Sequence, residues 1–264
     1  MSGLAFSRHC EPIGGLSIFY CDSLEFIVSE AYTVLDPEGE AIAGRFKIAF
    51  RGFYERALRD DASSQYFLAC CYFDGCGVRK SVSKGFQWLV KAAENGSDLG
   101  CDNLAKRYQD GNGCKKNTDQ AVFYYLKAFE LGDQNGAFNA AFVMIENADL
   151  SSQLSNAIEI LRNGALLGDL DCSHKLGFLY SDKERPCFCP AFAVFWYMFA
   201  VGQGSADSMF NLALIFDLGD IVSRDVHLAM YYYELSSKTG DLMARDNLSC
   251  LIDEFKELMS SKNR

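Results

Sequence analysis

Histidine, proline and long apolar runs are all scarce in this sequence, and each shortage excludes a class of protein. Only three of the 264 residues are histidine, namely His9, His174 and His227. None of them stands beside a plausible nucleophile, so a catalytic triad would have to be assembled by chance. With 4 prolines and 14% aromatic residues, the chain is not a disordered one.

The longest apolar run covers residues 191–201, which is far short of the ~20 residues that cross a bilayer. Because Pro190 and Gly202 flank it, the run predicts a buried helix. The first ten residues lack a charged start followed by a continuous apolar stretch, so we predict no signal peptide and a cytoplasmic protein.

Positive charge is in short supply as well. The chain has 25 Lys and Arg against 35 Asp and Glu, for a formal net charge of −10 and a pI of about 4.8. An acidic surface repels phosphate backbones and anionic lipids, so we expect neither nucleic acid nor membrane as a partner. The 11 cysteines are odd in number and their spacings do not repeat as pairs, which favours reduced thiols.

The strongest feature is a chain break repeated every 36 residues. Glycine occupies five places in this register, and Asp60 occupies the place before them. The glycines are Gly96, Gly132, Gly168, Gly204 and Gly240. Glycine suits the end of a helix, where the backbone turns left-handed. The register therefore predicts an internal repeat, which settles the architecture.

Each 36-residue unit has two stretches of helical periodicity, which we term helix A and helix B. In helix A a large, a small and a large residue stand at spacings of one and four, as in Leu104, Ala105 and Tyr108. In helix B the spacings are three, four and seven, as in Ala121, Tyr124 and Ala128. Both patterns give one apolar helix face. One helix pair cannot bury its apolar face alone, so the units must stack into an all-α solenoid.

The unit at residues 97–132 resembles a Sel1-like repeat, a relative of the tetratricopeptide repeat. The resemblance rests on Leu104 to Gly113 with its two loop glycines, on Ala121 to Ala128, and on the closing Gly132. It covers roughly residues 61–252 and implies a right-handed solenoid of stacked helix pairs. The third, fourth and fifth units lack the paired loop glycines, so we expect the loop between helix A and helix B to vary.

The repeat divides the chain into three parts. We expect residues 1–60 to form an N-terminal segment with a degenerate capping helix pair at residues 24–60. Residues 61–258 form the solenoid, with units at 61–96, 97–132, 133–168, 169–204 and 205–240 and a final helix at 241–258. Residues 259–264 form a polar tail.

Chemical motifs are weak by comparison. The Gly75-x-Gly77 and Gly111-x-Gly113 loops lack the preceding strand and the third glycine of a dinucleotide site. The pairs Cys172-x-His174 and Cys187-x-Cys189 have one intervening residue, whereas zinc sites favour two to four. We therefore expect no catalytic residue, no metal and no cofactor.

A partner would meet the face of helix A opposite its core, because the resemblance implies that helix A lines the concave side. Two columns of residues, 36 apart, occupy this face, and aromatic side chains are frequent in both. The first column is Tyr66, Asp102, Phe138, His174 and Phe210, and the second is Cys70, Lys106, Phe142, Phe178 and Leu214. Exposed aromatics often anchor a protein partner. The alternative is that they pack sideways against neighbouring A helices.

The resemblance and the acidic charge together predict a non-enzymatic, bacterial-type protein that binds another protein. Sel1-like proteins include inhibitors, so the sharper prediction is an immunity protein that sequesters a secreted toxin, such as a basic nuclease. Two alternatives remain open. One is an adaptor or regulatory scaffold in a signalling complex, and the other is a small-molecule-binding or hydrolytic enzyme.

Overall fold

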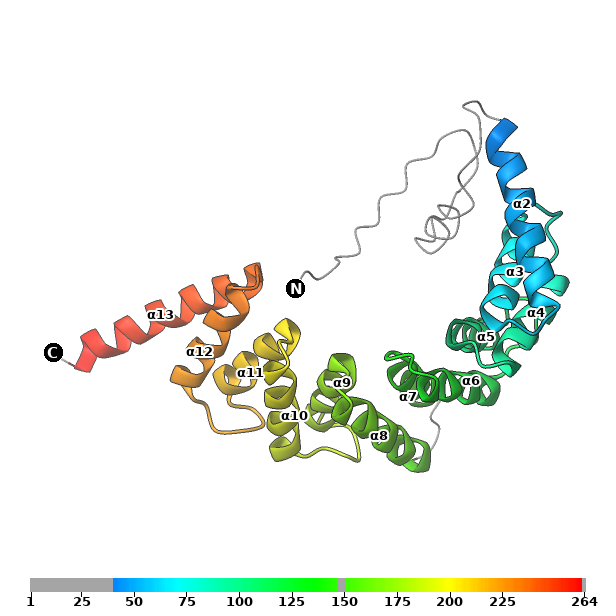
Figure 1. The fold of residues 1–264 in the computed structure, drawn as a ribbon. Coiled ribbons are helices and arrows are strands. Elements are labelled where there is room, and N and C mark those ends of the chain that lie inside the picture. Colours follow the sequence, from blue (N-terminus) through cyan, green and yellow to red (C-terminus); the bar gives the residue numbers. More distant parts are fainter. Residues whose placement is uncertain (1–39, 147–150, 263–264) are drawn as a thin grey trace.

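The computed structural model describes residues 40–146 and 151–262, and within these ranges the chain forms helices and no strand (Figure 1). The helices are α2 (Glu40–Ala57), α3 (Ala62–Asp74), α4 (Val82–Glu94), α5 (Asp98–Asp110), α6 (Thr118–Glu130), α7 (Gly136–Glu146), α8 (Ser151–Leu166), α9 (Leu170–Ser181), α10 (Pro190–Gly202), α11 (Ala206–Leu218), α12 (Val226–Ser237) and α13 (Leu242–Lys262). The predicted all-α solenoid is confirmed.

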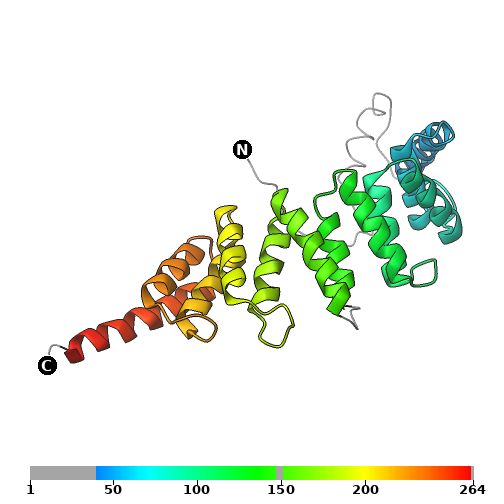
Figure 2. The ribbon, with the colours of Figure 1, turned by 90° about the horizontal axis from the view of Figure 1, so that it is seen from below.

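Each helix packs against the helix before it and the helix after it, as expected for stacked pairs. The odd-numbered helices α3 to α13 are the A helices, and the even-numbered ones are the B helices. Together they follow an arc from α2 to α13, with α7, α9 and α11 on its inner side and α6, α8 and α10 on its outer side (Figure 1). Some consecutive A helices also touch each other directly, as α3 touches α5 and α9 touches α11. Viewed from the convex side, the pairs form successive layers along the arc (Figure 2).

Left-handed residues end the pairs where the 36-residue register places them. All five glycines of the register have φ between 89° and 106°. Asp60, in the same register, adopts φ 61°, the single non-glycine residue with positive φ in the described part of the chain. Such a conformation is unfavourable for residues with a Cβ atom. The backbone therefore explains why glycine recurs at this place.

Small polar residues begin the next helix in most pairs. The side chain of Asp61 accepts a hydrogen bond from the backbone N–H of Ser64 at 3.1 Å, and Ser97 and Ser205 cap α5 and α11 in the same way. Each cap satisfies one of the free N–H groups of a first helical turn. The chain therefore turns from one pair into the next over three to five residues.

The core runs along the arc as a column of fully buried residues on the A helices, with no exposed surface on any of them. These are Leu68, Leu104, Ala140, Leu176 and Leu212. The equivalent residue on α13, Leu248, is only half-buried, because no B helix follows α13 among the described residues. The small residue that follows Leu248 in the pattern, Ser249, is exposed.

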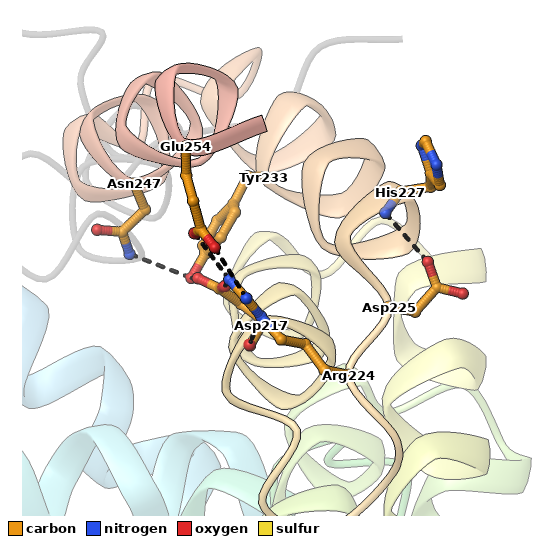
Figure 3. A network of polar contacts seen from close by, with 7 residues as sticks. All are labelled: Asp217, Arg224, Asp225, His227, Tyr233, Asn247 and Glu254. Carbon is orange, nitrogen blue, oxygen red and sulfur yellow. Dashed lines mark hydrogen bonds and ion pairs between the residues drawn. The ribbon is translucent and has the colours of Figure 1, made fainter. Parts of the chain in front are cut away.

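A polar network attaches α13 to the preceding pair (Figure 3). The guanidinium of Arg224, in the α11–α12 loop, donates to both carboxylate oxygens of Glu254 on α13, at 3.0 and 2.9 Å. It also donates to the side chain of Asp217 at 3.2 Å. The hydroxyl of Tyr233 donates to Asp217 and accepts from Asn247 of α13, each at 3.3 Å.

The structure corrects one expectation from the sequence. Residues 191–201 lie in α10 as predicted, but α10 is not a buried helix, since the side chains of Phe192, Phe195 and Met198 are exposed. Its inner face alone is buried, through Ala193, Trp196, Tyr197 and Ala200. An all-apolar sequence indicated burial on every side, but no other element covers the outer side of this helix in the described part of the chain.

The ends of the chain differ in how much the structure describes. Helix α13 continues to Lys262, so the helix extends into residues 259–264, which the sequence marked as a polar tail. Helix α2 occupies the second half of the expected capping pair, whereas the first half, at residues 24–39, lies outside the described residues. Among the described residues, no helix is both long and apolar enough to span a membrane.

Candidate protein-binding surface

The first column of concave-face residues is largely held between neighbouring A helices. Tyr66 is buried, and its hydroxyl accepts a hydrogen bond from Asn103 of the next A helix at 3.3 Å. Asp102 is half-buried and accepts from Asn139 of the next A helix at 3.4 Å. A ladder of polar contacts therefore links successive units along the inner side of the arc.

The rest of this column continues the same arrangement. Phe138 and Phe210 are half-buried and pack against the cores of their units. His174 is half-buried, with its Nδ1 2.9 Å from the hydroxyl of Ser208 on the next A helix and its ring 5.5 Å from that of Tyr197. Burial lowers the pKa of His174, which favours its neutral form near neutral pH.

The second column is more open. Lys106 and Phe178 are exposed, Phe178 to 43%, and Phe142 is half-buried. The rings of Phe138 and Phe142 stack with centroids 6.2 Å apart, and the ammonium of Lys175 lies over both Phe142 and Phe178, at 5.7 and 5.2 Å. Cys70 and Leu214 are half-buried and pack against their cores. These two therefore offer a partner less surface than the three at the centre.

A pocket of about 400 Å³ opens beside this aromatic group, where the first turns of α5, α7 and α9 meet. Four carboxylates line it, together with the ring of Phe138 and one cation, Lys106. The carboxylates belong to Asp98, Asp102, Asp133 and Asp171. We name this feature the acidic pocket. Acidic side chains thus gather at one place on the inner face, next to the aromatic rings.

Burial and like charge both act on the acidic pocket. Burial raises the pKa of Asp102, and the neighbouring carboxylate of Asp133 raises it further, whereas Lys106 opposes them. Burial likewise raises the pKa of Asp171, with Asp169 adding to the effect. A raised carboxyl pKa means that the negative charge is disfavoured where it stands. A cation that entered the pocket would offset the repulsion between these carboxylates and stabilise their charged form.

The sequence columns contained Asp102 and Lys106 but missed Asp98, Asp133 and Asp171. Asp98 and Asp171 lie in the first turns of α5 and α9, where a carboxylate also stabilises the helix dipole. A carboxylate in a first helical turn therefore has a structural role of its own, which does not by itself indicate a binding site. The recurrence of such carboxylates at the starts of neighbouring A helices was the signal that could have placed them together.

The cysteine and histidine pairs of the fourth unit do not form a metal site. Cys172 is buried, and its thiol donates to the carboxylate of Asp169 at 3.0 Å. The thiol of Cys187 donates to the backbone carbonyl of Leu179 at 3.3 Å. Across residues 40–146 and 151–262, no group of three or more His, Cys, Asp or Glu side chains could hold a metal ion. The described cysteines are all free thiols.

Comparison with known proteins supports the repeat directly. The Sel1 repeat family model matches residues 62–97, 99–133 and 206–241. The chain is also similar to the crystal structure of a Sel1 repeat protein from Oxalobacter formigenes, with a TM-score of 0.59 and 24% identity over 85% of this chain and 86% of that one.

Two further solved structures are similar. One is c5321, a protective antigen of uropathogenic Escherichia coli with an SLR fold, at a TM-score of 0.52 and 22% identity over 89% of this chain and 56% of that one. The other is the immunity protein Pa5087 from Pseudomonas aeruginosa, at a TM-score of 0.41 and 19% identity over 85% and 84% of the two chains. The first supports the fold, and the second is too distant to bear on function.

Proposed function

We propose that this chain, which carries Sel1 repeats at residues 62–97, 99–133 and 206–241, is a non-enzymatic inhibitor that sequesters another protein. A basic segment of the partner enters the acidic pocket, and the aromatic residues beside the pocket anchor it. In its sharper form, the partner is a secreted toxin with a basic surface, and this chain is the cytoplasmic immunity protein against it.

The acidic pocket carries the proposal. Four carboxylates against one ammonium, in a volume of about 400 Å³, suit a lysine or arginine side chain better than a neutral or acidic one. Since the pKa of Asp102 is already raised by burial and by Asp133, an incoming cation gains a desolvated charge partner. Partly buried ion pairs of this kind are screened by salt less than exposed ones.

The aromatic residues supply the second contact. The ammonium of Lys175 lies over the rings of Phe142 and Phe178 and so helps to fix their orientation, while Phe178 stays 43% exposed. A basic segment that places one cation in the pocket and an apolar side chain on the exposed surface of Phe178 would use both features. Aromatic anchors next to charged pockets are typical of residues that dominate binding energy.

The net charge of −10 supports the identity of the partner. Like charges over the rest of the surface would steer a basic protein towards the chain and repel nucleic acid. A basic nuclease toxin binds nucleic acid through a positive surface, so an acidic solenoid seated on that surface would block its substrate. An inhibitor of this kind needs no catalytic residue of its own.

The test compares two charge-matched variants of the full chain. Asp102→Asn with Asp133→Asn removes two carboxylates from the acidic pocket, whereas Asp119→Asn with Asp246→Asn removes two exposed carboxylates elsewhere. Each tagged protein is used to capture partners from the source bacterium. We expect the control variant to capture a basic partner as well as the unaltered chain does. The pocket variant should capture at least tenfold less of that partner.

The captured partner then separates inhibition from adaptor function. Co-expression with this chain should suppress the toxicity or enzymatic activity of the partner, and the pocket variant should fail to do so. A partner that is acidic, or one that both variants bind equally, would refute the role of the pocket. A partner that keeps its full activity within the complex would contradict inhibition and favour the adaptor.

A further inference from the structure

The outer face of α10 differs from that of every other B helix. The helix spans Pro190–Gly202 and contains no charged residue. Phe195 and Met198 on its outer side are 53% and 51% exposed, and Phe192 is also exposed. At 100° per residue, Phe192, Phe195 and Met198 fall within about 120° of one another, so they form one stripe along the helix.

The other fully described B helices carry charge on the corresponding side. Two repeats earlier, α6 has Phe123 at the place of Phe195, but Asp119, Lys127 and Glu130 share that helix. In α8 the equivalent place is held by Glu159, which is exposed. An isolated exposed aromatic is ordinary, whereas a helix face made of nothing else calls for a partner.

The next B helix extends the apolar stripe. On α12, Leu228 and Tyr231 stand 36 residues after Phe192 and Phe195, and both are exposed. The place of Met198 is held there by exposed Glu234, which pairs with Lys238 at 2.8 Å, so α10 alone has no charge on this face. Phe188, in the loop before α10, is exposed as well. We name these six residues the outer stripe: Phe188, Phe192, Phe195, Met198, Leu228 and Tyr231.

Neighbouring aromatic rings hold the exposed side chains of α10 in place. The ring of Phe195 packs edge-on against Trp196 at 5.1 Å and stacks with Phe199 at 6.3 Å. Phe192 packs against Tyr180 at 5.2 Å. Because Trp196 and Tyr180 are themselves buried, these exposed rings lose little conformational freedom when a partner covers them.

We propose that the outer stripe is the contact surface between two copies of this chain, which associate back to back through α10. Two copies that each carry a net charge of −10 repel each other wherever acidic surfaces meet. They can therefore associate only through a face without charge, and α10 supplies one. A basic partner, in contrast, would gain nothing from this neutral face.

The size of the stripe sets the strength of the dimer. Its six side chains are between 37% and 57% exposed, and an aromatic side chain buries ~150–250 Å² in full. Together they offer about 500 Å², compared with about 800 Å² per partner in a stable interface. The contact is thus smaller than a standard interface, so the dimer should be weak, reversible and dependent on concentration.

Back-to-back association leaves the inner side of the arc free. Helix α10 lies on the outer side, opposite α9 and α11 (Figure 1), so two-fold symmetry about α10 points both acidic pockets away from each other. The same apolar patch serves both copies, as in an isologous dimer. The dimer does not depend on the proposed partner of the pocket.

Sedimentation velocity of the full chain, from low to high micromolar concentration, tests this arrangement. The unaltered chain should shift reversibly from monomer to dimer. Phe195→Glu should weaken the association at least tenfold. Phe123→Glu adds the same charge at an equally exposed aromatic, 56% against 53%, and should leave the association unchanged. Circular dichroism of each variant verifies the fold, and Met198→Gln provides a milder second variant on the stripe.

Each outcome decides the proposal. A dimer that Phe195→Glu and Met198→Gln weaken, and that Phe123→Glu and the Asp102→Asn/Asp133→Asn pocket variant preserve, supports it. A chain that stays monomeric at every concentration overturns the proposal, and a different protein would then be the partner of the outer stripe. A dimer that is indifferent to both stripe variants overturns it as well, because another face would then hold the two copies together.

Discussion

Replacing Gly177 by alanine should destabilise the fourth unit, although alanine is the better helix former. Gly177 lies in α9 at the small position of the A-helix pattern, which alanine holds in the first three units. A Cβ atom at Gly177 would stand 2.6, 2.7 and 2.8 Å from three carbons of the Tyr197 ring. That ring is 2% exposed, so it has little room to move away.

Two opposing effects set the magnitude. Alanine gains about 1 kcal/mol of helix propensity over glycine, whereas an extra methyl in a filled core costs about 1–3 kcal/mol. The net effect is a loss of up to about 2 kcal/mol. Gly52→Ala in α2 is the matched control, since a Cβ there would meet nothing within 4 Å, and it should gain about 1 kcal/mol. Since about 1 kcal/mol shifts Tm by ~2–4 °C in a chain of this size, the two variants should differ clearly.

Thermal unfolding followed by circular dichroism measures both variants, and a double-mutant cycle tests the cause. On a Tyr197→Leu background the clash is gone, so Gly177→Ala should then be neutral or stabilising. Leucine is already the natural residue at this place in the third unit, as Leu161 opposite Ala141. A Gly177→Ala chain that is as stable as the Gly52→Ala chain would refute the reasoning, because Tyr197 could then adjust to a neighbouring methyl.

Three further predictions concern charge and thiols. Asp102→Asn should stabilise the chain near neutral pH. The raised pKa of Asp102 means that its charge costs stability, so the gain should vanish as the pH falls through that pKa; a loss at neutral pH in urea unfolding would contradict this. Arg224→Ala should speed amide exchange in α13, most at low salt. Because Arg224 lowers the pKa of Glu254, the difference in exchange rate between the variant and the unaltered chain should disappear once acid protonates Glu254. Equal exchange rates in the two chains at neutral pH would show that the network does not hold α13. Among the cysteines of residues 40–146 and 151–262, a thiol reagent should modify exposed Cys250 first and buried Cys172 only after unfolding, because burial also raises the pKa of Cys172; equal rates at these two residues would contradict the packing.

The sequence predicted the repeat because its signals are local. A glycine such as Gly132 is required by the backbone at that residue, where φ is 106°, and the requirement holds whatever surrounds it. Likewise, the spacing of Leu104, Ala105 and Tyr108 defines one helix face by itself. Such constraints recur in successive units, so each unit independently supports the same prediction of a helix pair.

Exposure on the inner face could not be predicted in the same way. Helical periodicity places Tyr66 and Phe178 on the same side of their helices, yet Tyr66 is buried and Phe178 is exposed. Tyr66 packs within a core cluster of the first units, and its hydroxyl accepts a hydrogen bond from Asn103 of the next A helix. How closely neighbouring A helices approach depends on the curvature of the whole array, which no single helix encodes.

The sequence by itself determined that this protein is a stack of helix pairs, where the left-handed residue between successive pairs stands, and which face of the A helices forms the core. Only the tertiary structure decided which of the remaining faces are open. It brought Asp98, Asp133 and Asp171 together in one pocket, although 35 or more residues separate each from the next. It also left the apolar helix α10 exposed, because burial depends on what stands opposite a side chain, and that neighbour belongs to a different part of the chain.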